Sequence, residues 1–112
     1  MVLNITKNKK IGEKARICSG FLCKTIGLMF STKPRTIIFS FDFEQRQYLH
    51  MFFVFFPIDL IFLDSDKQVV ELKENFRPFT FYNSKKEAQY VIECPAGKIK
   101  ETKTSVGDKV KF

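Results

Sequence analysis

Residues 49–64 read LHMFFVFFPIDLIFLD and form the most apolar stretch of this 112-residue chain. Such a run is buried in a folded protein because its removal from water is favourable, and the other segments then pack around it. Pro57 divides the stretch, since proline has no N–H group to donate to a sheet from a central position. We therefore expect two core strands, over residues 49–56 and 58–63, joined at Pro57.

Further strand signals alternate with turn residues along the chain. Residues 36–43 (TIIFSFDF) place phenylalanine at positions 39, 41 and 43, a period of two that is typical of a strand. Residues 2–6 and 14–18 alternate apolar and polar residues and predict a first hairpin. The remaining expectations are a polar turn over residues 44–47, a polar loop or single helical turn over 83–87, strands over 68–73, 90–94 and 109–112, and helical turns within 19–29 and 98–106.

Seven or eight short strands with little helix indicate a mainly β fold. The pattern is typical of a β-sandwich or a partly closed barrel, here with one or two short helices. The length is that of one domain, so we expect a single domain over residues 1–112.

The composition favours a globular domain with a basic surface. With 45% hydrophobic residues and fourteen phenylalanines, the chain can build a stable core without disulfide or metal cross-links. A net charge of +7 and a pI near 9.4 would suit nucleic acid, acidic lipid or an acidic protein partner. The lysines are scattered and do not gather in one block, so we favour a role in solubility.

Three features bear on location. The odd number of cysteines argues against a disulfide framework and favours a reducing compartment. The first ten residues, MVLNITKNKK, lack the apolar region of a signal peptide. The apolar stretch is shorter than the roughly 20 residues of a membrane-spanning helix, and Pro57 interrupts it. We expect a soluble, cytoplasmic protein without a transmembrane segment.

Asp59 and His50 are the polar side chains embedded in the apolar stretch. Uncompensated burial of a carboxylate between Ile58 and Leu60 would cost several kcal/mol. The interpretation that we favour is structural: Asp59 accepts backbone N–H bonds and fixes the loop at Pro57. The functional alternative makes it a ligand acceptor or a general base in a pocket. His50 is the only histidine, and among apolar neighbours such a residue is more often structural than catalytic.

The sequence gives no sign of a metal site or of a bound cofactor, and we expect neither. Cys18 and Cys23 are followed only by the distant Cys94, which is not a recognised zinc spacing. We favour a role for the cysteines as small buried hydrophobic residues.

Residues 77–82 (RPFTFY), followed by Lys85 and Lys86, combine basic and aromatic side chains. Interfaces with single-stranded nucleic acid have this character. A hydrophobic loop flanked by solvated lysines explains the same pattern, and we favour that explanation. Nucleic acid is therefore an alternative partner that we do not favour.

Four motifs occur in a recognisable order: GLMF at residues 27–30, PID at 57–59, ECPAG at 93–97 and GD at 107–108. With them, the chain from residue 17 to residue 112 resembles the family labelled domain of unknown function 192. Residues 50–54 read HMFFV where many members have Trp-Met followed by Lys-Asn-Thr, which indicates an archaeal form. The resemblance implies a β-rich sandwich or barrel of jelly-roll type, and it implies no established activity.

The function that we expect is a non-enzymatic binding or interaction module. Its pocket would lie near the central strands and take a small ligand or a partner's chain end. The candidate ligand-binding residues are His50, Asp59, Met29 and Glu93, although a salt bridge or a loop-fixing hydrogen bond would also explain Glu93. The alternative from another class is a hydrolase-type enzyme that uses Asp59 with His50, which requires the two side chains within hydrogen-bond reach in an open cleft.

Overall fold

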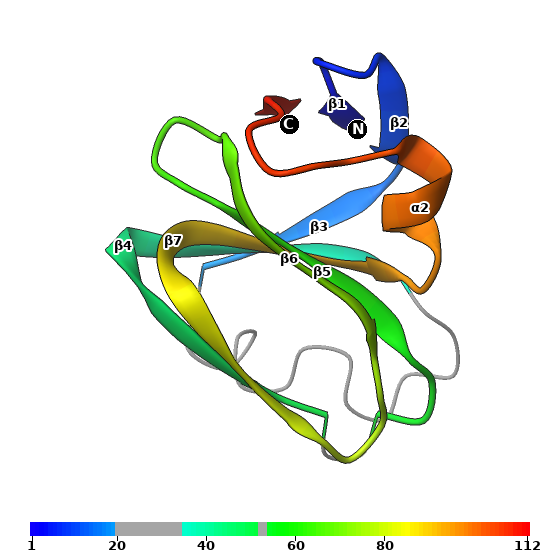
Figure 1. Cartoon of the computed structure of the whole chain (residues 1–112), viewed down its shortest axis with the longest axis vertical. Coiled ribbons are helices and arrows are strands. Elements are labelled where there is room, and N and C mark those ends of the chain that lie inside the picture. Colours follow the sequence, from blue (N-terminus) through cyan, green and yellow to red (C-terminus); the bar gives the residue numbers. More distant parts are fainter. Residues whose placement is uncertain (20–34, 52–53) are drawn as a thin grey trace.

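The chain forms two β-sheets and one short helix within residues 1–19, 35–51 and 54–112, the residues that this computed structural model describes (Figure 1). Before the helix come strands β1 (Val2–Asn4), β2 (Lys9–Gly12), β3 (Ala15–Cys18), β4 (Thr36–His50), β5 (Ile58–Leu63), β6 (Val69–Phe76) and β7 (Phe81–Pro95). The helix α2 (Lys98–Thr102) follows β7, and β8 (Val110–Lys111) closes the series.

The larger sheet has five strands in the order β3-β4-β7-β5-β6. Its first pair, β3 and β4, runs parallel, and the other neighbours run antiparallel. The smaller sheet, in the order β2-β1-β8, lies with α2 on one side of the larger sheet (Figure 1). This arrangement confirms the mainly β, sandwich-like fold. The described strands do not close into a barrel, because β3 and β6 remain the two edges of the larger sheet.

Buried apolar side chains cover both faces of the larger sheet. Ile38, Ile61 and Ile92 belong to the cluster that packs against β1, β2, α2 and β8. Ile37 and Leu60 belong to a second cluster. Successive residues of a strand point to opposite faces, which separates neighbours such as Ile37 and Ile38 into different clusters.

β5 is the best-buried strand, since all six of its residues (IDLIFL) are buried between β6 and β7. A strand covered on both faces reads as a continuous apolar run without alternation. The expectation of a core strand over residues 58–63 is therefore confirmed.

The expected core strand over residues 49–56 is wrong. β4 ends at His50, and Met51 and residues 54–57 lie outside the strands. The Met51 N–H donates to the carbonyl of Thr80, and the Val54 N–H donates to the carbonyl of Met51. Met51 and Val54 are nevertheless buried. The apolar pattern here reflects burial of an irregular segment and not pairing in a sheet.

The expected turn over residues 44–47 and the expected loop over 83–87 are also wrong. Both segments belong to the long antiparallel pair of β4 and β7. The register of this pair shifts between Ser40 and Gln45 and again between Arg46 and Tyr48. Such irregularities bend strands and disturb the alternation of buried and exposed residues, so the polar segments resemble turns in the sequence.

The first hairpin is formed by β1 and β2, whereas β3 joins the other sheet in parallel with β4. The expected pairing of residues 2–6 with 14–18 is therefore wrong. The helical turn within residues 98–106 and the strand within 109–112 are confirmed as α2 and β8. The helical turn expected within 19–29 lies, from residue 20 on, outside the described residues. In the described part of the chain, no helix has the length and apolar character needed to cross a membrane.

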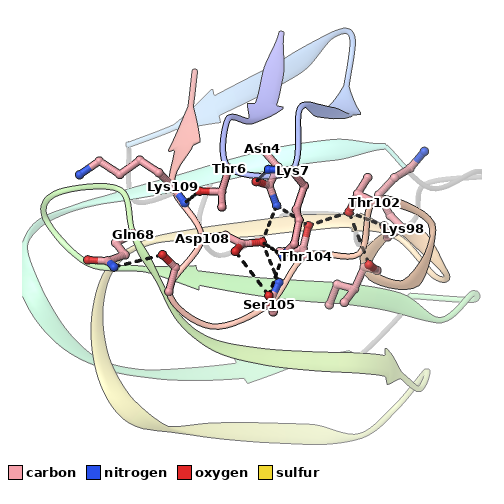
Figure 2. A network of polar contacts seen from close by, with 12 residues as sticks. Asn4, Thr6, Lys7, Gln68, Lys98, Thr102, Thr104, Ser105, Asp108 and Lys109 are labelled. Carbon is pink, nitrogen blue, oxygen red and sulfur yellow. Dashed lines mark hydrogen bonds and ion pairs between the residues drawn. The ribbon is translucent and has the colours of Figure 1, made fainter.

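A polar network joins the two ends of the chain (Figure 2). The Asp108 carboxylate accepts hydrogen bonds from Asn4 Nδ2 at 2.9 Å, Lys7 Nζ at 2.8 Å and the Ser105 N–H at 3.0 Å. Asn4 Nδ2 also donates to Thr104 Oγ1 at 3.0 Å. Burial opposes ionisation of Asp108, but the hydrogen bonds outweigh burial and lower its pKa to about 2. The network holds the small sheet against the segment that precedes β8.

Candidate functional site

Asp59 is a buried carboxylate on β5, and backbone donors occupy both of its oxygens. The residue is 1% exposed. Oδ1 accepts a hydrogen bond from the N–H of Asn75 at 3.0 Å. Oδ2 accepts from the N–H groups of Gly97 at 3.0 Å and Ile99 at 2.9 Å. These three bonds attach the end of β6 and the start of α2 to β5.

The bonds of Asp59 are of the kind expected from the sequence, but they come from other donors. We expected the loop at Pro57, whereas the donors come from β6 and from the turn after β7. Gly97 has φ 94°, a left-handed conformation that glycine adopts most readily. This conformation turns the chain so that the N–H groups of Gly97 and Ile99 converge on one carboxylate oxygen.

Glu93 lies on the opposite face of the same sheet. In the pairing of β5 with β7, Asp59 is opposite Cys94 and Leu60 is opposite Glu93. Directly opposed residues share a face and successive residues alternate, so the sheet separates the two carboxyl groups. Asp59 and Glu93 therefore do not line one common pocket.

Glu93 stands at the centre of a row of side chains that crosses this face. The row follows the strand order β3, β4, β7, β5 and β6 and consists of Arg16, Ile37, Glu93, Leu60 and Lys73. Neighbouring strands lie about 4.8 Å apart, so the backbones at Arg16 and Glu93 are separated by roughly 10 Å. The row has a cation at each edge and a carboxyl group in the middle.

The Glu93 carboxyl group makes no hydrogen bond or ion pair with another described residue, although the residue is only 7% exposed. No described polar atom is both sealed from solvent and unpaired. Burial raises the pKa of Glu93 to about 8. Near neutral pH the protonated form predominates, and it can donate a hydrogen bond.

A pocket of about 360 Å³ lies where β3 and β4 begin. Ile37, the neighbour of Glu93 in the row, forms part of its apolar lining. Three cations gather around it, and none of them was a candidate from the sequence, because the pocket joins distant segments. The lining residues are Lys14, Ala15, Arg16, Arg35, Thr36 and Ile37.

His50 lies at the other end of the sheet from Asp59. Its partner on β7 is Phe81, whereas the partner of Asp59 is Cys94 near the opposite end of that strand. The Asp59 carboxylate bonds only to backbone N–H groups and is sealed from solvent. The pair that a hydrolase would need is not assembled, and that hypothesis is wrong. Met29 lies outside the described residues.

The cysteines differ from one another. Cys94 is free and buried, and burial together with the nearby Asp59 carboxylate raises the pKa of its thiol. Cys18 is disulfide-bonded, a bond that the argument against a disulfide framework did not anticipate. Cys23 lies outside the described residues. Among the residues that the structure describes, no three His, Cys, Asp or Glu side chains gather as a metal site would require.

The model of the DUF192 family, described as uncharacterized ACR, matches residues 2–112. The chain belongs to the DUF192 family. A UPF0127 protein of Pyrococcus abyssi is 40% identical over 114 residues, which cover 100% of the DUF192 chain and 97% of the relative. A UPF0127 protein of Thermococcus sibiricus is 37% identical, over 98% of the chain and 73% of the relative. These relatives confirm the family resemblance and its archaeal form.

Two solved structures share the fold of this DUF192 chain. A protein from Sinorhizobium meliloti 1021 matches with a TM-score of 0.82 and 24% identity, over 87% of this chain and 79% of that one. A protein of unknown function from Novosphingobium aromaticivorans matches with a TM-score of 0.81 and 23% identity, over 88% and 74%. At these identities the likeness concerns the fold alone.

Proposed function

We propose that this DUF192 chain is a non-enzymatic binding module that takes a small organic anion against the Glu93 face of its larger sheet. The observation that carries the proposal is the row Arg16, Ile37 and Glu93 beside a pocket of about 360 Å³. Ligand pockets of proteins combine such volumes with apolar walls and a few convergent polar groups.

Residues of the pocket and of the row have separate tasks in this proposal. Lys14 and Arg16 attract the carboxylate or phosphate group of the ligand, since charge-assisted hydrogen bonds to such groups are strong. Ala15 and Ile37, the apolar residues of the lining, meet the apolar part of the ligand. Glu93, the next residue in the row, does not line the pocket, and its protonated carboxyl group adds no negative charge that would repel the ligand.

The chemistry of these groups supports binding over catalysis. A general base must be ionised at its working pH. Glu93 has a pKa of about 8 and is mostly protonated near neutrality. Asp59, the other buried carboxylate of β5 and β7, already accepts three backbone hydrogen bonds on the opposite face.

Hexanoate is a suitable probe because it combines one carboxylate with a short apolar chain. Binding to the native state raises the melting temperature in proportion to RT ln(1 + [L]/Kd). We expect hexanoate to stabilise the native protein and the Lys100→Ala variant equally, because Lys100 is exposed on α2 away from the pocket. The double variant Lys14→Ala/Arg16→Ala should lose the stabilisation. Equal stabilisation of all three proteins would contradict the proposal.

A further inference from the structure

A second surface lies away from the Glu93 row, where β4 and β7 continue together toward the lower end of the molecule in Figure 1. Here Tyr48 pairs with Asn83, and His50 pairs with Phe81. Paired residues share a face, so these four side chains point to one side of the two-stranded ribbon. The intervening residues are buried or half-buried: Gln47, Leu49, Tyr82 and Ser84. We call the outward side, formed by Arg46, Tyr48, His50, Phe81 and Asn83, the ribbon face.

The ribbon face exposes two large aromatic rings to solvent. Tyr48 is 69% exposed and Phe81 is 67% exposed. They occupy diagonal positions across the pair, which are about 7–8 Å apart. Phe55 and Phe79 are also more than half exposed and meet edge to face, with ring centroids 5.8 Å apart. Monomeric proteins rarely gather exposed apolar side chains in this way without a binding partner.

Hydrogen bonds hold the frame of this surface in place. The Phe79 N–H donates to the Met51 carbonyl at 2.7 Å, and the Met51 N–H donates to the Thr80 carbonyl at 2.8 Å. Thr80 Oγ1 donates to the carbonyl of Arg77 at 2.6 Å, which closes the turn before β7. These bonds join the segment that carries Phe79 to the end of β4 and to the start of β7.

Exposed basic residues lie on the ribbon face and on the segments next to it. Arg46 belongs to the ribbon face, and its Nε donates to the carbonyl of Ser84 at 3.0 Å, which fixes the side chain. Lys85 and Arg77 are exposed on neighbouring segments. Two acidic residues are exposed in the same region: Glu87, which pairs with Arg46 in the ladder, and Glu74, three residues before Arg77. The surroundings favour a polyanion, in agreement with the net charge of +7.

We propose that the ribbon face binds single-stranded nucleic acid. Tyr48 and Phe81 stack on bases, and Arg46, Lys85 and Arg77 contact phosphates. Proteins that bind single strands combine stacking platforms with basic side chains along the path of the backbone. An exposed pair of strands lets bases lie on the exposed rings, which a deep pocket does not. The proposal does not depend on the pocket at the start of β3 and β4.

Fluorescence anisotropy with labelled oligo-dT and oligo-U of about ten nucleotides tests the proposal. We expect binding that weakens with salt, with a slope of about −0.7 for each phosphate contact. Tyr48→Ala and Phe81→Ala should each weaken binding about tenfold. Tyr48→Phe keeps the ring and should bind like the native protein. Lys85→Ala should make the salt slope shallower, and Glu87→Gln should tighten binding.

Phe43→Ala is the matched control, since Phe43 is a 64% exposed ring on β4 between two acidic residues, Asp42 and Glu44. It should leave the affinity unchanged. The absence of oligonucleotide binding, an affinity that does not respond to salt, or an equal loss in Phe43→Ala and Tyr48→Ala would each overturn the proposal. So would binding to vesicles of acidic phospholipid with no binding to either oligonucleotide.

Discussion

Asp59 and Glu93 lie on adjacent strands and point to opposite faces of the same sheet. The two carboxyl groups have contrasting surroundings. Three backbone N–H groups bond to Asp59, whereas Glu93 has no such partner among the described residues and its pKa is raised to about 8 by burial. The contrast assigns Asp59 to the integrity of the fold and makes Glu93 the stronger candidate for ligand contact.

Asp59→Asn should destabilise the protein by about 3 kcal/mol. The amide has a single acceptor oxygen, so at least one buried N–H group of Asn75, Gly97 or Ile99 loses its partner. Urea unfolding measures the loss. Asp66→Asn, at an exposed turn position, is the control and should change the stability little. If both variants unfolded at the same urea concentration as the native protein, the assigned role of Asp59 would be wrong.

Glu93 should make the protein less stable as the pH rises. Its pKa is about 8 in the folded state and near 4.5 in an unfolded chain, so the unfolded state gives up this proton first. Stability should therefore fall between about pH 4.5 and pH 8, by up to about 4 kcal/mol at roughly 1.4 kcal/mol per pKa unit. Glu93→Gln should remove this slope in urea unfolding measured across the range. Identical pH profiles of the variant and the native protein would contradict the raised pKa of the buried Glu93 carboxyl group.

Asp108 should make the protein less stable as the pH falls. Its pKa falls from 3.8 to about 2 on folding, so its contribution is fully present above about pH 4 and is lost as the pH drops toward 2. Asp108→Asn should lower the stability near neutral pH and shift acid unfolding, followed by circular dichroism, to a higher pH. Lys7→Ala should produce a smaller shift in the same direction, because Asn4 and Ser105 still donate to the carboxylate. If Asp108→Asn unfolded in acid at the same pH as the native protein, the network in Figure 2 would contribute nothing to stability.

The sequence predicted β5, the strand that is buried on both faces. β5 was readable because a strand covered on both faces is a continuous apolar run. The sequence did not predict the strand structure of residues 44–47 and 83–87. These residues lie in an irregular two-stranded ribbon of β4 and β7, where buried and exposed residues alternate poorly. The stretch after His50 is apolar because Met51 and Val54 fill the core from an irregular segment.

The candidate site was readable only in part. The chemistry of Asp59 could be inferred, because a carboxylate inside an apolar strand needs donors. The identity of its donors could not, since Gly97 and Ile99 are brought to it by the turn before α2. The row of Arg16, Ile37 and Glu93 depends on the parallel pairing of β3 with β4, which the sequence did not indicate.

The most direct test of the account is a titration of the isotope-labelled protein with hexanoate, followed by the backbone amide signals in NMR. We predict saturable shifts at Arg16, Ile37 and Glu93, no comparable shifts at Ile99 on the other face, and loss of the response in Lys14→Ala/Arg16→Ala. Shifts confined to the Asp59 and α2 side of the sheet, or a response that survives in the double variant, would contradict the account.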